Sequence, residues 1–255
     1  MIRAGEAIRD GVSPLVPGFT VEVLPEVDST NTELMRRARA GRTEPVLLVA
    51  EHQTAGRGRL GRNWASAPGD SLTFSLGLML APAAWSGLSL AVGVALAETL
   101  HPRVRIKWPN DLWLDDRKLA GILIETASST ADANGPRYAV IGVGINVARP
   151  PADGLATPPA GLDEVMPQAR ARDVLVRLAR PLVEAVKAFE TFGFAPFQAR
   201  FEARDALRDR AVALSDGTAG TAHGTTEAGG LLVHTAAGMV AVTSAEVSVR
   251  PARGE

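Results

Sequence analysis

The chain has 255 residues, 46% of them hydrophobic, and its 27 Lys and Arg side chains against 28 Asp and Glu give a net charge of −1. This length and composition are typical of one large globular domain with a small second one, and they argue against a disordered chain. The balanced charge argues against a surface built throughout for nucleic acid, and the lack of cysteine excludes disulfides, thiolate metal sites and a thiol nucleophile.

The N-terminal part predicts a strand followed by a helix. Residues 1–18 have few periodic apolar positions, so we expect a loosely packed lead-in, and they lack the apolar core of a signal peptide. Apolar residues alternate over 20–24 as they do in a strand. Thr30 and Glu33 then have the spacing of a capping box, which predicts a helix that ends before Gly41.

Polar residues gather at the start of this helix, where Ser29, Thr30 and Asn31 follow one another. Hydroxyl and amide groups at a helix start either cap the helix or point into a pocket, and capping is the commoner role. The sequence leaves both roles open.

The stretch from Glu51 to Trp64 is rich in arginine and glycine. Within seven residues it contains Arg57, Arg59 and Arg62 together with Gly56, Gly58 and Gly61. Arginine stays charged at any useful pH and glycine lets the backbone approach a ligand closely, so this loop is predicted to bind an anion. A solvated surface loop is the alternative. The G-x-G-x-x-G spacing does not indicate a dinucleotide site, because residues 63–70 cannot begin the helix that such a site requires.

The other segments predict an alternation of strands and helices and then an all-β tail. In order, we expect strands at 46–50 and 71–80, a helix at 86–100, strands at 104–108, 112–114, 118–125 and 138–147, a surface loop at 149–163, and helices at 173–189 and 195–206. Short strands at 212–214, 218–223, 230–234 and 239–249, separated by glycine turns, predict a small β-barrel. The longest apolar stretch carries Glu98 and is too short to span a bilayer.

Lys118 follows an acidic turn and precedes an apolar run. Its neighbour Asp116 suggests a surface salt bridge, whereas the buried-strand pattern of 119–124 places the lysine at the mouth of a sheet, where it could face an anion. With Arg57 and Arg59 it would supply three positive charges. Joining a carboxylate to the α-phosphate of ATP needs such charges, because two anions must meet. Motifs of P-loop NTPases, serine hydrolases and zinc proteases are absent, and the four histidines are too scattered to suggest a metal site.

Five motifs occur in an order that resembles one family, the biotin protein ligases. They are Asp28-Ser-Thr-Asn31, Glu51-x-Gln-x-Ala-Gly-Arg-Gly-Arg-x-Gly-Arg-x-Trp64, Lys107-Trp-Pro-Asn-Asp111, Asp116-Arg-Lys-Leu-Ala-Gly-Ile-Leu-x-Glu125 and Gly142-x-Gly-Ile-Asn146. The resemblance implies an α+β fold with a mixed central sheet flanked by helices, of the class II synthetase-like biotin/lipoate ligase type. It also implies a catalytic domain at 1–206 and a small SH3-like β-barrel domain at 207–255.

The resemblance further implies a two-step reaction. Biotin and MgATP give biotinyl-5′-AMP and pyrophosphate, and biotin then passes to one lysine of the biotin carboxyl carrier protein or domain of a biotin-dependent carboxylase. It assigns biotin contacts to Ser29, Thr30, Asn31, Gln53, Arg57, Gly58, Arg59, Trp64, Lys118, Gly121 and Gly142, and ATP contacts to Arg57, Arg59, Asn110, Lys118 and Asn146. Lys118, Arg59 and Asp111 are the catalytic residues implied, and no metal ligands are assigned.

Within those sets the resemblance gives individual roles. Ser29, Thr30 and Gln53 would hydrogen-bond the neutral head group of biotin, and Trp64 would form an aromatic wall. Asn146 would contact adenine. Asp111 would orient or deprotonate the incoming lysine and Asn110 would serve the phosphates, although the division between these two is open.

The resemblance also suggests the setting of the protein. Because the motifs begin at Asp28, we expect a ligase without a DNA-binding domain, located in the cytoplasm, with no nucleic-acid or membrane partner. A homodimer is left open. The alternatives are a non-catalytic biotin or nucleotide sensor on the same fold and a lipoate-type ligase. Related octanoyltransferases act through a cysteine, which this chain lacks.

Overall fold

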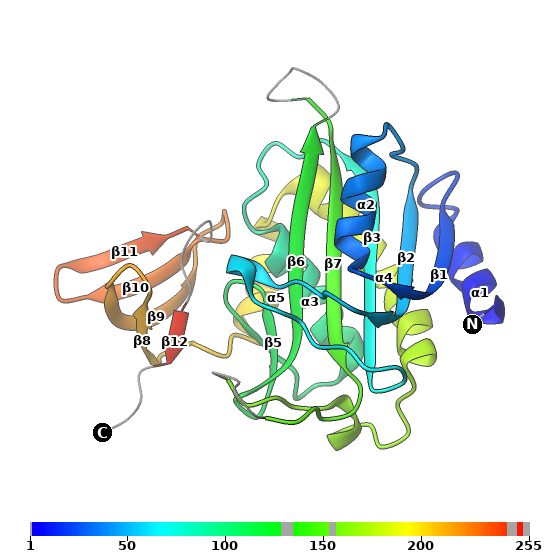
Figure 1. The fold of residues 1–255 in the computed structure, drawn as a ribbon. Coiled ribbons are helices and arrows are strands. Elements are labelled where there is room, and N and C mark those ends of the chain that lie inside the picture. Colours follow the sequence, from blue (N-terminus) through cyan, green and yellow to red (C-terminus); the bar gives the residue numbers. More distant parts are fainter. Residues whose placement is uncertain (1, 129–134, 153–156, 244–248, 252–255) are drawn as a thin grey trace. The chain divides into compact units, whose positions relative to one another are not determined.

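The computed structural model describes residues 2–128, 135–152, 157–243 and 249–251. The chain divides into two compact units, of which the first comprises Met1–Ala81 and Arg117–Glu184 and the second Pro82–Asp116 and Ala185–Glu255. Figure 1 shows the helices and strands of both. The domain boundary that we place between residues 206 and 207 stays a prediction.

A mixed sheet forms the centre of the first unit (Figure 1). Within this unit its strands are β1 (Thr20–Val27), β2 (Val46–Gln53), β3 (Ser71–Leu80), β7 (Arg137–Asn146) and β6 (Arg117–Ser128), in that spatial order. β1 pairs with β2 in parallel, and every later pair in this order is antiparallel. The structure thus confirms the mixed sheet and the strands predicted for this part of the chain.

The sheet register brings several strand ends to one edge of the unit. Ala50 of β2 pairs with Thr73 of β3, Thr73 with Gly144 of β7, and Gly144 with Gly121 of β6. Beyond this row β7 ends and β6 begins, and β2 ends at Gln53, where the arginine loop (residues 54–64) follows. Segments that are far apart in sequence therefore leave the sheet side by side.

Helix α2 (Thr30–Arg39) connects the two parallel strands and packs on the sheet (Figure 1). Leu34 is fully buried in a cluster with Leu48 of β2 and Tyr138 of β7. The predicted end is confirmed, since Gly41 has a φ of +79°. The predicted cap is wrong by one residue.

Ser29, rather than Thr30, is the N-cap of α2, because its side chain accepts a hydrogen bond from Thr32 N at 3.4 Å. The capping box therefore does not form. Thr30 and Glu33 have the right spacing for one, but Glu33 is bound by Arg36 and Arg37.

The N-terminal segment is a helix, so the expected loose lead-in is wrong. Helix α1 (Ile2–Val12) packs on β1 (Figure 1). Ile8 and Val12 are 3% and 0% exposed and stand one helical turn apart, which gives the helix a buried stripe. Two glycines in this short segment lower its helix propensity and hide the stripe in the sequence.

The second unit contains helix α3 (Leu88–Leu100), the hairpin of β4 (Arg105–Lys107) and β5 (Asp111–Leu114), the short helices η3 (Ala195–Phe197) and α5 (Gln198–Glu202), and a second sheet. Trp108 is fully buried and donates Nε1–H to the carbonyl of Gly229 at 3.0 Å, which ties the hairpin to the C-terminal segment. Gly87 must lack a side chain, because an added Cβ would lie 2.6 Å from Phe194 Cβ.

The second sheet confirms the all-β tail. It is antiparallel, with the order β11 (Gly238–Val242), β10 (Leu231–Thr235), β9 (Ala219–Thr225), β8 (Ala211–Leu214) and β12 (Val249–Pro251). Alternate residues are buried on two of these strands, Val212 and Leu214 on β8 and Leu231 and Val233 on β10. Part of the strand expected at 239–249 falls on residues 244–248, and part of the loop expected at 149–163 falls on 153–156, both outside the described residues.

The longest helix is α4 (Ala171–Phe192), which confirms the amphipathic helix expected there. It carries charged residues along its length and contains Pro181. A short 3₁₀ helix, η2 (Leu162–Glu164), precedes it. No helix in the described part of the chain combines the length and the hydropathy that crossing a membrane requires.

Asp205 is a buried acid between α5 and β8. The residue is 6% exposed, and Oδ1 accepts a hydrogen bond from Leu207 N at 2.8 Å. Oδ2 is buried and makes no hydrogen bond among the described residues. Burial disfavours the charged form and raises the pKa of Asp205 from 3.8 to about 6.

We predict that Asp205→Asn changes how stability depends on pH. The raised pKa means that the acid stabilises the fold below about pH 4 and that this contribution is lost as pH rises through about 6. Asparagine keeps an acceptor for Leu207 N–H and carries no charge, so from pH 4 to pH 8 the variant should gain about 2 kcal/mol relative to the wild type. Urea unfolding across this range measures the difference. Parallel pH profiles for the two proteins would show that Asp205 is not the titrating group.

Candidate active site

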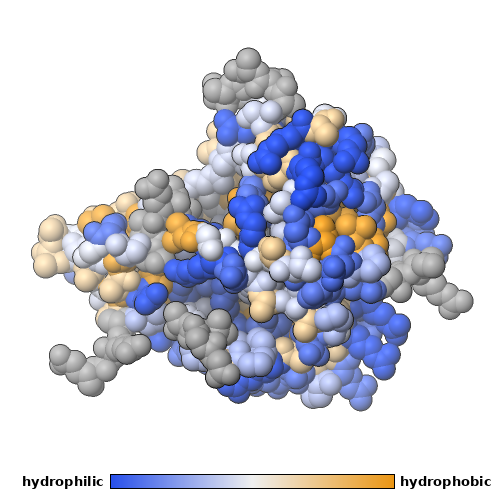
Figure 2. Space-filling model, viewed as in Figure 1, coloured by the Kyte–Doolittle hydropathy of each residue, from blue (hydrophilic) through white to orange (hydrophobic). Residues whose placement is uncertain are grey.

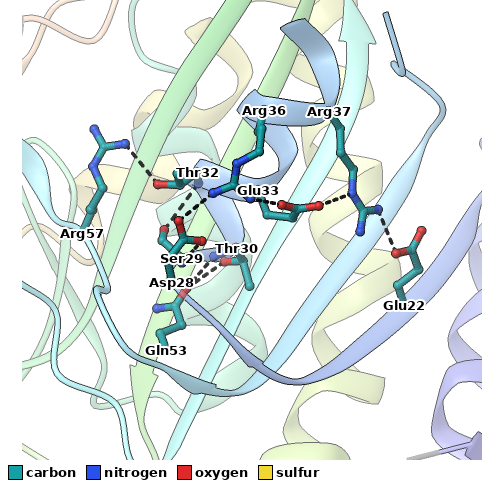
Figure 3. Close-up of polar contacts among 10 residues, drawn as sticks. All are labelled: Glu22, Asp28, Ser29, Thr30, Thr32, Glu33, Arg36, Arg37, Gln53 and Arg57. Carbon is teal, nitrogen blue, oxygen red and sulfur yellow. Dashed lines mark hydrogen bonds and ion pairs between the residues drawn. The ribbon is translucent and has the colours of Figure 1, made fainter. Parts of the chain in front are cut away.

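Gln53 and Thr30 meet where β2 ends. Gln53 Oε1 accepts hydrogen bonds from Thr30 N at 2.8 Å and Thr30 Oγ1 at 3.1 Å (Figure 3). The parallel register pairs Val27 with Gln53, so the residues that follow β1 lie beside the last residue of β2. Thr30 and Gln53 are 3% and 8% exposed, and Gln53 Nε2 makes no hydrogen bond within the described residues.

Ser29 adds a hydroxyl to this group. Its oxygen accepts the capping bond from Thr32 N, and its backbone N donates to Asp28 Oδ1 at 2.8 Å (Figure 3). The hydroxyl hydrogen is left to donate elsewhere. Together with the Gln53 amide, this gives donors and an acceptor for an uncharged polar group.

Ser75 lies beneath these residues and was missed in the sequence. It is fully buried on β3, with Oγ 2.7 Å from Thr30 Oγ1 and 2.6 Å from Asn31 Oδ1. Only two hydroxyl hydrogens serve the three contacts that link Gln53, Thr30, Ser75 and Asn31, so two contacts can form at a time. A hydroxyl between Phe74 and Leu76 in an apolar strand is the signal that could have revealed it.

Asn31 points its amide at the sheet. Both hydrogens of Nδ2 are used, by Leu123 O at 3.2 Å and by Glu125 Oε2 at 2.9 Å. A Cβ added at Gly142 would lie 2.1 Å from Asn31 Oδ1, so Gly142 makes room for this amide. Direct contact of Asn31 or Gly142 with biotin therefore stays a prediction.

The arginine loop is a folded hairpin. Gly58 N donates to Arg62 O at 2.7 Å and Trp64 N donates to Gly56 O at 2.9 Å. Its first residues are fastened to the end of β1, where Ala55 N donates to Asp28 O at 2.8 Å. A 3₁₀ turn, η1 (Arg59–Gly61), forms its tip.

Arg57 binds neighbouring elements at the base of the loop. It donates to Glu125 Oε1 at 3.2 Å and to Thr32 Oγ1 at 3.4 Å, and Figure 3 shows it turned toward the start of α2. Half of its side chain is exposed to solvent. The remaining guanidinium hydrogens are available for an anion.

Trp64 and Lys118 come together over two glycines. A Cβ at Gly144 would lie 2.4 Å from the Trp64 ring, so the indole rests directly on the backbone of β7. Lys118 Nζ is 5.8 Å from the Trp64 ring centroid, a cation–π distance, and 3.4 Å from the Cβ position of Gly121. The acid proposed as a surface partner of Lys118, Asp116, pairs with Arg210 at 2.6 Å.

Asn146 fastens the end of β7. Nδ2 donates to Ala160 O at 3.0 Å and to Lys118 O at 3.3 Å, and the residue is 7% exposed. Backbone bonds from Lys118 N to Pro158 O at 2.8 Å and from Ala160 N to Lys118 O at 2.9 Å complete the joint. Asn146 thus fixes the backbone of Lys118, while contact with adenine stays a prediction.

Asn110 and Asp111 belong to the second unit, where they lie at the turn of the β4–β5 hairpin. Lys107 Nζ is 4.0 Å from Asp111 Oδ2 and 5.5 Å from the Trp113 ring centroid. The side chains of Lys107 and Asp111 are 11% and 13% exposed. The Asp111 carboxylate is therefore held close to a cation, and the roles of Asn110 and Asp111 stay predictions.

A chain of ion pairs fixes the first turns of α2. Arg37 joins Glu22 to Glu33, and Arg36 joins Glu33 to Asp28 (Figure 3). The hydrogen bond from Arg37, opposed by burial, lowers the pKa of Glu33. Hydrophilic residues cover most of the surface over α2 (Figure 2). No three His, Cys, Asp or Glu side chains among the described residues are grouped so that they could hold a metal.

Comparison with known proteins agrees with the family resemblance of the sequence motifs. Residues 23–146 match the model of the biotin/lipoate A/B protein ligase family. The chain is 38% identical over 250 residues to the bifunctional ligase/repressor BirA of Escherichia coli, covering 92% of this chain and 75% of that protein. It is 32% identical over 243 residues to the biotin–[acetyl-CoA-carboxylase] ligase of Paracoccus denitrificans, covering 88% of this chain and 98% of that protein.

A solved structure shares the fold. The biotin protein ligase of Aquifex aeolicus, in complex with biotin and ATP, superposes with a TM-score of 0.77 at 30% identity and covers 91% of this chain and 99% of that one. The match to the family model, residues 23–146, contains the arginine loop and the glycines at 121, 142 and 144. The chain is therefore a member of the biotin/lipoate A/B protein ligase family and, within it, of the biotin protein ligases.

Proposed function

We propose that this chain activates biotin with ATP and transfers it to a lysine of a biotin carboxyl carrier protein or domain. In the first step a biotin carboxylate oxygen attacks the α-phosphorus of ATP, giving biotinyl-5′-AMP and pyrophosphate. In the second step the lysine amine attacks the acyl carbon, AMP leaves and the amine loses a proton. The observation that best supports this is the arrangement of Lys118, Trp64 and the arginine loop at one edge of the sheet.

The polar group at the end of β2 suits the head of biotin. The ureido ring is neutral and carries both donors and acceptors, as the Ser29 hydroxyl and the Gln53 amide do. Trp64 supplies an apolar ring next to this group. Recognition of biotin thus uses uncharged contacts, which leaves the cations for the reacting groups.

Three cations serve the reacting anions. Arg57 and Arg59 would hold the carboxylate and the phosphates, and Lys118 would stabilise the negative charge that develops on the carboxyl and α-phosphoryl oxygens. Attraction by fixed cations offsets the repulsion between the two anions before the reaction. Mg²⁺ would enter with ATP as part of the substrate.

The remaining roles rest on the family resemblance. Asn146 would contact adenine, Asp111 would orient the acceptor lysine and Asn110 would serve the phosphates. A cytoplasmic location, the absence of nucleic-acid and membrane partners and homodimer formation also remain predictions from the sequence.

Incubation with biotin and MgATP, followed by mass spectrometry for biotinyl-5′-AMP, tests the proposal. Lys118→Ala should keep the fold and lose most adenylate formation, by about 100-fold or more, because its charge matters chiefly in the transition state. Arg180→Ala, which alters an exposed pair with Glu184, is the matched control. Wild-type protein that binds biotin but forms no adenylate would indicate a sensor, and lipoyl-AMP formation in preference would indicate a lipoate ligase.

Arg59→Gly should release the activated adenylate early. The arginine loop can close over the ligand only if its cations find the phosphate, so losing one loosens the closed state. Biotinylation of unrelated lysines, measured by streptavidin blot on a mixture of carrier domain and albumin, should rise. Labelling confined to the carrier domain at an unchanged rate would show that the loop does not retain the adenylate.

Ligand should further restrain residues 54–64, which already form a hairpin with backbone hydrogen bonds and the Arg57–Glu125 contact. The loop carries cations that repel one another and glycines that favour no single conformation, so ordering it costs entropy. A bound adenylate gives the cations a phosphate partner, and charge-assisted hydrogen bonds of about 1.5–3 kcal/mol each can offset that cost. Hydrogen exchange with and without biotin plus ATP measures this, and equal, strong protection in both states would remove the ordering step.

A further inference from the structure

The carboxylate of Glu125 connects the arginine loop to the floor of the site. One oxygen, Oε2, accepts from the Asn31 amide at 2.9 Å, and the other, Oε1, accepts from Arg57 at 3.2 Å. Glu125 stands on β6, opposite Val140 of β7, and its side chain is 22% exposed. A single side chain therefore touches a buried amide on one side and a loop cation on the other.

The position of Glu125 is set by its buried neighbour. Asn31 is 3% exposed, and its amide is held by Ser75 Oγ at 2.6 Å, by Leu123 O at 3.2 Å and by the space that Gly142 leaves. An amide with two hydrogen-bond partners besides Glu125 cannot turn without losing hydrogen bonds. Glu125 is thus a fixed acceptor, whereas its partner Arg57 is half exposed on a loop.

Arg57 uses only part of its guanidinium in these contacts. One terminal nitrogen donates to Glu125 and the other to Thr32, a residue in the first turn of α2. Glu125 neutralises Arg57 while the loop is empty, and an incoming phosphate can take over the same cation. An ion pair that is half exposed is weak enough to be exchanged in this way.

We propose that Glu125 is a positioning residue that serves as the resting partner of Arg57 and holds the arginine loop in place until a ligand anion takes over the guanidinium. The anion is a phosphate or carboxylate, and naming it as that of biotinyl-5′-AMP rests on the proposed function. Glu125 itself does not touch the reacting atoms.

Hydrogen exchange of the loop in ligand-free protein tests the proposal without relying on activity. Glu125→Gln and Arg57→Gln should each speed exchange of residues 54–64 by about two- to fivefold, the factor expected for a half-exposed ion pair. The double variant should be no faster than the faster single variant, because both changes break one contact. Glu184→Gln, which breaks the exposed Arg180–Glu184 pair at 2.8 Å, is the matched control and should leave the loop unchanged.

Two further readouts separate an ion pair from a purely structural role. Raising salt from about 0.05 M to about 0.5 M should speed loop exchange in the wild type and not in Glu125→Gln, because salt screens charge. Exchange of β3 and β7 monitors the core. If Glu125→Gln disturbs that core, Arg57→Gln decides alone, since its side chain is half exposed.

Several outcomes would overturn the proposal. They are unchanged loop exchange in Arg57→Gln, additive effects in the double variant, or a wild-type loop that is insensitive to salt. A separate arm with biotin and MgATP should reduce the difference between wild type and Glu125→Gln, since the ligand then holds Arg57. Failure of that arm alone would count against the proposed function and leave the resting contact standing.

Discussion

The candidate site depends on two side chains that pack directly against the backbone of β7. The Asn31 amide occupies the place of a side chain at Gly142, and the Trp64 ring occupies the place of one at Gly144. Any Cβ at these two positions would meet an atom at 2.1 Å or 2.4 Å. The start of α2 and the far end of the arginine loop can therefore pack against the same strand only because β7 has no side chain at positions 142 and 144.

The sheet register turns this local constraint into a site. Because β2, β3, β7 and β6 share one row of paired residues, the exit of β2 and the entry of β6 fall at the same edge. Gln53 leaves from the first and Lys118 enters at the second. The ion pairs of Arg36 and Arg37 link α2 to Asp28 and to Glu22 of β1. They help to hold the polar residues at the start of α2 near that edge.

Much of this arrangement could be predicted from the sequence. Alternating apolar residues and short apolar runs predict most strands, and the density of arginine and glycine between 56 and 62 marks the loop, because these signals are local. Asn146 was singled out from its motif, but its two hydrogen bonds to carbonyls across the β6–β7 joint depend on contacts that no local pattern encodes.

The features that the sequence did not predict also have physical reasons. The helix at 2–12 was overlooked because its glycines weaken the propensity signal, while the packing of Ile8 and Val12 on β1 decides the outcome. Ser75 was overlooked because a single hydroxyl in a strand has no meaning until its partners are known. The sequence marks Glu125 only as the last residue of a motif, because its partners Arg57 and Asn31 lie 68 and 94 residues away along the chain.

The parallel pairing of β1 and β2 has a consequence for how ligand choice is encoded. The uncharged polar side chains at the end of β2 come from one continuous piece of chain, residues 20–53, which forms a strand–helix–strand unit, whereas the cations come from outside it, at 57–59 and 118. Under the proposed function, head-group recognition and phosphate chemistry would therefore depend on different segments. Exchanging residues 20–53 between relatives would then change the polar side chains that meet the head group and leave Arg57, Arg59 and Lys118 in place.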